Sequence, residues 1–169
     1  MTKYEKLKLC DVAEIASGQP APQKESLFGN SGHPFIRAGS LEGLVSGKFE
    51  NSYERISDSI AEKLNLRLFP VNTILFAKSG MSAKMDRVYR LKVPCYVVSH
   101  LAAIVPGERI ESAYLQRWFE NNPPSKLIPN DAYPSIRLAS ISDMEIVLPS
   151  LSKQKHIAIS LDKVDSLRK

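Results

Sequence analysis

The sequence predicts a single α+β domain, rich in β-strands, that is followed by the start of a C-terminal helix of the coiled-coil type. The 169 residues, 43% of them hydrophobic, supply one apolar core and are too few for two comfortable domains. Short apolar runs bounded by Gly and Pro recur along the chain, as in strands. From Ser152 onward the pattern changes to that of a charged amphipathic helix.

In the first third of the chain, apolar and polar residues alternate over residues 7–15, which predicts a strand passing into a turn or short helix. Residues 16–32 are rich in Gly, Pro, Ser, Gln and Asn and predict a long loop. Residues 34–38 predict a short strand, and three glycines within 39–47 predict a turn.

The middle of the chain carries most of the predicted sheet. Ser59 followed by Glu62 has capping-box spacing and predicts a helix over residues 58–65. The β-forming run 73–77 leads into a polar loop at 78–82. Further strands are predicted at residues 87–93, 95–99 and 101–105, between prolines that interrupt them.

The last third predicts two helices. Apolar residues spaced along one face predict a helix over 111–121, which Pro123 and Pro124 end. Residues 130–137 predict a loop, and 138–148 a turn capped by Ser140 and then a strand. In the final segment Ile157, Leu161 and Val164 form an apolar seam for a partner helix.

The charge of the chain is concentrated in one segment. Residues 67–92 carry six basic side chains and one acid, Asp86, an excess equal to the net charge of +5 of the whole chain. A local basic excess favours encounter with phosphate-bearing partners. The alternative is a solvated face that keeps the protein soluble.

Composition also excludes several classes. The first residues lack the apolar stretch of a signal peptide, and no apolar run approaches the roughly 20 residues that span a bilayer, so we expect a soluble cytoplasmic protein without membrane contact. Cys10 and Cys95 have no CxxC or histidine-rich neighbourhood, which predicts buried thiols rather than a disulfide or a zinc site.

No catalytic constellation is evident. Asn122-Pro-Pro-Ser lacks the aromatic residue of the amino-methyltransferase motif and is interpreted as a helix stop. Carboxylates and lysines do not form a nuclease pattern, no phosphate-binding Gly-rich loop is present, and His33, His100 and His156 have no second ligand at metal spacing. We therefore expect no enzyme, no cofactor and no metal.

Polar and basic residues at predicted loop ends are instead the candidates for a DNA-binding site. Arg, Lys, Asn, Ser and Tyr side chains reach phosphates and base edges, and loops on a rigid sheet commonly carry such residues. The candidates are Arg37, Lys78, Ser79, Ser82, Lys84, Arg87, Asn130, Tyr133, Ser135 and Arg137.

The end of the chain resembles a known family. Residues 148–162 read Leu-Pro-Ser-Leu-Ser-Lys-Gln-Lys-His-Ile-Ala-Ile-Ser-Leu-Asp, similar to the Leu-Pro-x-x-x-x-Gln-x-x-Ile-Ala-x-x-Leu-Asp signature of type I restriction-modification specificity subunits. Other segments resemble the family in its order along the chain, namely residues 9–15 with Gly18 and Pro20, residues 34–37, residues 74–80, and residues 134–136 with Ile141.

Two features depart from the family. Lys153 stands where an acidic residue is often found, which affects the surface of the helix rather than the fold. Whole subunits of the family carry two recognition domains and two long helices, whereas this chain has one domain and a short piece of one helix. It is therefore expected to be a half subunit, a natural truncation or an excised piece.

The resemblance implies that residues 1–150 form one target recognition domain and that residues 151–169 begin a dimerisation and spacer helix. It implies a non-catalytic chain that reads one half of a bipartite site in double-stranded DNA. Its protein partners would be a methyltransferase subunit and, through it, a restriction subunit. Pairing of the family's helices implies a weak homodimer through the seam of residues 157, 161 and 164.

Two other functions stay open at this point. An adaptor, such as an assembly or anti-restriction protein, would use the same helix without binding DNA. An RNA-binding module is a third reading, disfavoured because aromatic residues are not clustered on an evident sheet face. Salt titration of duplex binding distinguishes these readings.

Overall fold

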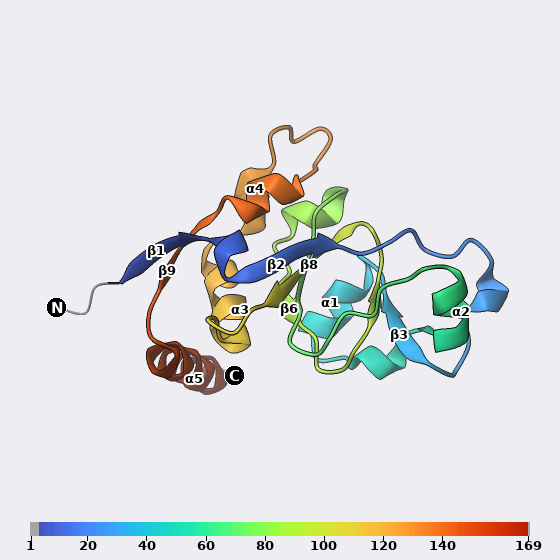
Figure 1. Ribbon diagram of the computed structural model, residues 1–169, viewed down its shortest axis with the longest axis horizontal. Coiled ribbons are helices and arrows are strands. Elements are labelled where there is room, and N and C mark those ends of the chain that lie inside the picture. Colours follow the sequence, from blue (N-terminus) through green and yellow to red (C-terminus); the bar gives the residue numbers. More distant parts are fainter. Residues whose placement is uncertain (1–3, 169) are drawn as a thin grey trace.

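The computed structural model describes residues 4–168 of the chain. The predicted ranges 1–150 and 151–169 thus extend at their outer ends onto residues outside the described part. The molecule is elongated, with helix α5 (Leu151–Leu167) at one end and helix α2 (Asp58–Lys63) near the other (Figure 1). One continuous apolar core joins the strands and helices between them.

The main sheet has four antiparallel strands in the order β2-β8-β5-β6. These strands are β2 (Ala13–Ser17), β8 (Leu101–Pro106), β5 (Ile74–Ala77) and β6 (Tyr89–Arg90). Every residue of β5 is buried, as its unbroken run of apolar side chains predicts. The strands predicted at 73–77 and 101–105 are confirmed, and the one predicted at 87–93 is shorter.

Helix α3 (Ser112–Asn121) packs on this sheet, as predicted from its apolar face. The ring of Phe119 lies 4.9 Å from that of Phe76, and both side chains are fully buried. The helix ends directly before Asn122, and Pro124 begins the short 3₁₀ turn η5 (Pro124–Leu127). The interpretation of the Asn-Pro-Pro segment as a helix stop is therefore confirmed.

A second sheet of three short strands has the order β4-β3-β7, with β3 (His33–Ile36) between β4 (Arg55–Ile56) and β7 (Tyr96–Val97). β3 pairs antiparallel with β4 and parallel with β7. The chain passes from β2 onto β7 at Gly18, where an added Cβ atom would lie 2.1 Å from the Val97 carbonyl oxygen. Only glycine permits this approach, which joins the two sheets.

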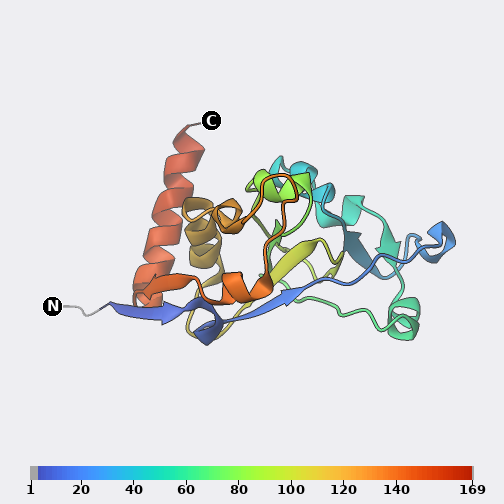
Figure 2. The ribbon, with the colours of Figure 1, turned by 90° about the horizontal axis from the view of Figure 1, so that it is seen from above.

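The first and last strands of the domain pair with each other. β1 (Glu5–Lys8) runs antiparallel to β9 (Glu145–Leu148), and an ion pair of 2.6 Å joins Lys6 to Glu145 across them. Figure 2 shows β1 and β9 side by side next to the start of α5. The two ends of the domain are thus held together, a pairing that the sequence did not predict.

Three local predictions are wrong. The glycine-containing segment predicted as a turn forms α1 (Ser40–Val45), because burial of Leu41 and Leu44 one helical turn apart outweighs the low helix propensity of Gly43. Helix α2 is capped by Ser57, whose Oγ accepts from the Ile60 N–H, rather than by Ser59. The turn attributed to Ser140 is α4 (Leu138–Ser142), which begins two residues earlier.

The cysteines also differ from the expectation. Cys95 is buried, and burial raises the pKa of its thiol well above the usual range. Cys10, by contrast, is exposed, because it lies in the short 3₁₀ turn between β1 and β2. No helix among residues 4–168 has the length and apolar character that a membrane span requires.

Helix α5 packs against α3 of its own chain (Figure 2). It begins after Ser150, whose Oγ accepts a hydrogen bond from the Lys153 N–H, and its buried residues are Gln154 and Ala158. The guanidinium of Arg117 on α3 pairs with Asp162 and Asp165 of α5, each at 2.5 Å. The helix is therefore fixed to the domain by polar and charged contacts.

The seam predicted on α5 is only partly turned toward the domain. Leu161 is half-buried, whereas Ile157 and Val164 remain 37% and 44% exposed. Ile157 and Val164 are two helical turns apart and share one flank of the helix. This flank is one exposed apolar surface of α5.

Candidate nucleic-acid interface

Two loops at the edge of the main sheet lie side by side in both ribbon views (Figures 1 and 2). Residues 78–87 follow β5 and include the 3₁₀ turn η4 (Met81–Lys84), and residues 129–137 precede α4. We call these two segments together the two-loop platform. It contains nine of the ten residues predicted to bind DNA.

The two loops are joined by backbone hydrogen bonds. Ser79 and Ser135 form an antiparallel bridge, in which the Gly80 N–H donates to the Pro134 carbonyl at 3.0 Å and the Ile136 N–H to the Lys78 carbonyl at 2.7 Å. Gly80 has φ +73°, a left-handed conformation that an L side chain rarely adopts. The loops therefore share one fixed relative position.

Side-chain contacts also hold the two-loop platform in place. The Asp86 carboxylate accepts hydrogen bonds from the Ser125 N–H at 3.0 Å and the Ser125 hydroxyl at 2.7 Å. Lys84 and Asp131 form an ion pair of 3.2 Å from one loop to the other. A loop pair held in this way can present side chains to a ligand without first being ordered.

The platform is polar and basic at its surface. Tyr133 is 81% exposed, and Asn130, Ser135 and Arg137 are also exposed. Lys78 is half-buried, and among residues 4–168 no carboxylate lies within ion-pair distance of its ammonium group. The remaining predicted residues of the platform, all half-buried, are Ser79, Ser82, Lys84 and Arg87.

Arg37, the tenth predicted residue, is not part of the platform. It follows β3, pairs with Glu54, and places its guanidinium 5.2 Å from the ring centre of Phe28 and 5.5 Å from that of Phe35. Arg37, Glu54 and Phe28 line a separate groove of about 630 Å³, together with residues of the loop that follows β2. The structure thus separates Arg37 from the other candidates.

The basic segment 67–92 does not form one continuous surface. Arg67 pairs with Glu14 on β2, and the hydrogen bonds from its guanidinium lower the pKa of that carboxyl. Arg90 donates to Gln116 and Ser112 on α3. Of the six basic residues, Lys78, Lys84 and Arg87 lie on the platform. Lys84 pairs with Asp131 at 3.2 Å and Arg87 with Glu42 at 3.3 Å, so only a small part of the charge excess is unpaired there.

Sequence reasoning missed two apolar residues of the platform. Met81 is the first residue of η4 and Met85 directly follows the turn; they are 68% and 55% exposed. A methionine in a predicted polar loop carries no signal by itself, since methionines are most often buried. Their exposure becomes evident only from the structure.

A cluster at the other end of the molecule was also missed. His33 Nδ1 lies 2.7 Å from Asp58 Oδ1, which also accepts a hydrogen bond of 2.9 Å from the Tyr96 hydroxyl. These hydrogen bonds lower the pKa of Asp58, while burial and the carboxylate raise that of Tyr96 to about 12. The cluster links α2 to β3 and β7, so its role here is structural. Within residues 4–168 no three His, Cys, Asp or Glu side chains converge as metal ligands.

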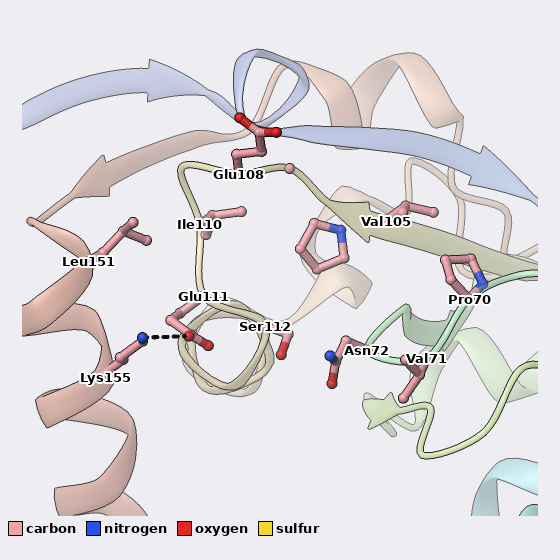
Figure 3. Close-up of a pocket in the computed structure, with 12 residues that line it drawn as sticks. Pro70, Val71, Asn72, Val105, Glu108, Ile110, Glu111, Ser112, Leu151 and Lys155 are labelled. Carbon is pink, nitrogen blue, oxygen red and sulfur yellow. Dashed lines mark ion pairs between the residues drawn. The ribbon is translucent and has the colours of Figure 1, made fainter.

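A hollow of about 350 Å³ lies where α5 meets the start of α3, on elements that do not belong to the platform (Figure 3). Glu111 and Lys155 form an ion pair of 3.7 Å at its edge, and Leu151 and Val71 are exposed beside it. It is an open hollow of mixed polarity, without a cluster of reactive groups.

Comparison with known proteins identifies the family of the chain. A family model described as "Type I restriction modification DNA specificity domain" matches residues 1–169. The MjaIX type I restriction enzyme specificity subunit of Methanocaldococcus jannaschii is 34% identical over 101 residues, which cover 60% of this chain and 23% of that protein. The chain thus spans about a quarter of the length of that relative.

Solved structures share the fold at low identity. A chain of a type I R-M system superimposes with a TM-score of 0.77 at 18% identity, and the HsdS subunit of Thermoanaerobacter tengcongensis with 0.68 at 18%. Each comparison covers 97% of this chain and 38% of the other. Because the family model matches the whole chain, the protein belongs to the family of type I restriction modification DNA specificity domains.

Proposed function

We propose that the two-loop platform reads one half of a bipartite sequence in double-stranded DNA, as a single target recognition domain of a type I specificity subunit. The observation that supports this most directly is the backbone bridge between Ser79 and Ser135, which holds two polar, basic loops as one rigid surface. Family membership makes DNA the ligand to test first.

The platform supplies two kinds of contact. Lys78, Lys84 and Arg87 are suited to phosphates, which fix position without reading sequence. Asn130 and Arg137 are exposed and have the hydrogen-bonding groups that distinguish base edges in the major groove. The three cations would then determine affinity for DNA, and Asn130 and Arg137 of the loop 129–137 would determine sequence preference.

The protein partners follow from the same proposal. In this proposal the chain acts in the cytoplasm and catalyses no reaction itself. It binds a methyltransferase subunit and, through that subunit, a restriction subunit. The exposed flank of α5, with Ile157 and Val164, is the surface proposed for protein partners. A weak homodimer through the same flank is the second use proposed for it.

Selection from a random duplex library tests DNA reading. The chain should enrich one short sequence, and Arg137→Ala or Tyr133→Ala should relax the preference at single positions by roughly 1–3 kcal/mol. Uniform weakening on all sequences would instead place these residues on phosphates. Enrichment of no sequence at any salt concentration would contradict the proposal.

Sedimentation with a methyltransferase subunit tests the flank of α5. Ile157→Asp and Val164→Asp should weaken assembly while the domain stays folded, because both side chains are exposed. Leu161→Asp is less suitable, since Leu161 is half-buried. Ile159→Asp is the matched control, because Ile159 is 54% exposed on the opposite side of the helix. Equal assembly of all these variants would contradict the assignment.

A further inference from the structure

The two-loop platform exposes apolar side chains among its cations. Met81 is 68% and Tyr133 81% exposed, each two residues beyond the serine pair that joins the loops. Single exposed apolar residues are common on protein surfaces. These two side chains belong to the same two loops as Lys78 and Lys84. Apolar side chains do not contribute to phosphate binding, so their exposure here indicates contact with another part of the ligand.

The width of the platform indicates which groove of DNA it fits. Two paired segments lie about 4.8 Å apart, and their side chains widen the unit beyond the roughly 6 Å of the minor groove. The major groove, about 12 Å wide, accepts a two-stranded unit. Met81 and Tyr133 lie on the two paired loops and are both exposed, so a platform docked in that groove would bring both side chains to the base edges.

The major groove presents one apolar feature, the C5 methyl group of thymine. We propose that Met81 and Tyr133 form an apolar reading edge that recognises thymine methyl groups within the target. This inference rests on the proposed function and adds to it the chemical feature that the site reads. The hydrogen-bonding residues of the platform then read the neighbouring base edges.

Contact with a methyl group fits these side chains better than insertion between base pairs. Prying a base step apart costs a few kcal/mol. The unbranched thioether of methionine has three rotatable bonds and adapts its shape, which suits a groove contact. Tyr133 adds a stiff, flat ring whose face covers a methyl group while its hydroxyl stays in water.

The test begins with the sequence that the full chain selects from a random duplex library. Each thymine of that sequence is then replaced in turn by deoxyuridine, which removes only the C5 methyl group. At one or two positions the replacement should weaken binding about fourfold, the effect expected of one buried methyl group. The other thymine positions should show no change.

Variants assign the effect to the side chains. Met81→Ala or Tyr133→Ala should bind thymine and deoxyuridine duplexes equally at the sensitive position. Met81→Leu, which stays apolar, should keep the discrimination, whereas Met81→Gln, which is polar and similar in length, should lose it. Ile159→Ala on α5 is the control, because it removes an exposed apolar side chain far from the platform.

The outcomes separate the inference from the proposed function. A selected sequence without thymine, insensitivity to deoxyuridine at every position, or unchanged discrimination in both alanine variants would overturn the reading edge while leaving DNA recognition intact. Failure to select any sequence would instead overturn the proposed function itself. Loss of the deoxyuridine effect in the platform variants alone supports the inference.

Discussion

Gln154 provides a sensitive test of how α5 is attached to the domain. Its side chain is fully buried at the start of the helix. Its Oε1 accepts from the Glu111 N–H at 2.8 Å, and its Nε2 donates to the carbonyls of Arg109 and Pro149 at 3.1 and 2.9 Å. One amide thus satisfies three backbone groups from two different segments.

The cost of removing it can be worked out from these bonds. Gln154→Leu is similar in size and leaves all three backbone groups without a partner, at about 1–3 kcal/mol for each buried group left unsatisfied. The free energy of unfolding should therefore fall by at least about 3 kcal/mol. Gln154→Glu keeps the acceptor for Glu111 but, when ionised, places a carboxylate oxygen against two carbonyl oxygens, so the loss should be at least as large at pH 7.

The pH dependence of Gln154→Glu provides a second measure. Burial and the facing carbonyls would raise the folded-state pKa of the new carboxyl above its unfolded value of about 4.3. Because the folded-state pKa is raised, the free energy of unfolding of the variant lies closest to that of the wild type below about pH 4. The difference between the two grows as the pH rises through the folded-state pKa.

Urea denaturation from pH 4 to pH 7, with hydrogen exchange of the α5 amides, measures both effects. Gln23→Glu is the matched control, because Gln23 is exposed, and should change stability by less than about 0.5 kcal/mol. If Gln154→Leu unfolds at the same urea concentration as the wild type, the buried amide is not what holds α5.

Three further predictions concern charged groups. Arg117→Met removes the ion pairs to three carboxylates on α3 and α5. Because the Arg117 side chain is only 20% exposed, the free energy of unfolding should fall by about 1–2 kcal/mol, and by less at high salt. An unchanged urea unfolding curve would contradict this. Lys78→Ala and Lys84→Ala should each flatten the plot of log binding constant against log salt by about 0.9, and wild-type slopes in both would remove them from the phosphate contacts. Asp58→Asn should reduce the loss of stability on acidification. The hydrogen bond with His33 lowers the pKa of Asp58, so the stability that this carboxylate contributes is present above its unfolded pKa and is lost as the pH falls through the lowered folded pKa. An unchanged stability loss at acid pH in a pH series of thermal unfolding would refute this.

Local patterns predicted the elements that local forces decide. The buried run of β5, the amphipathic face of α3 and the helix of α5 were all visible in the spacing of apolar residues. Helix α1 was not, because its two buried leucines gain their stability from the core and not from the segment itself. The pairing of β1 with β9 joins residues near the two ends of the domain, and no short-range pattern specifies such a partner.

The candidate site shows the same division. The chemistry of loop residues identified nine members of the two-loop platform, because polar side chains at strand ends are visible in the sequence. The bridge between Ser79 and Ser135 and the support of Asp86 by Ser125 depend on three-dimensional proximity and were not predicted. Charge summed along residues 67–92 overestimated the basic surface, since Arg67 is neutralised by Glu14, a residue distant in sequence.

The pairing of β1 with β9 brings the entry and the exit of the chain to one place on the domain. The chain enters along one strand and leaves along its antiparallel neighbour, with Glu5 opposite Leu148. Within a longer polypeptide, the segments before and after this unit would therefore start close together, and no connecting segment would have to run along the unit. If the proposed function holds, this geometry suits replacement of the unit as a whole, provided that β1, β9 and the buried Gln154 amide at the start of α5 are kept.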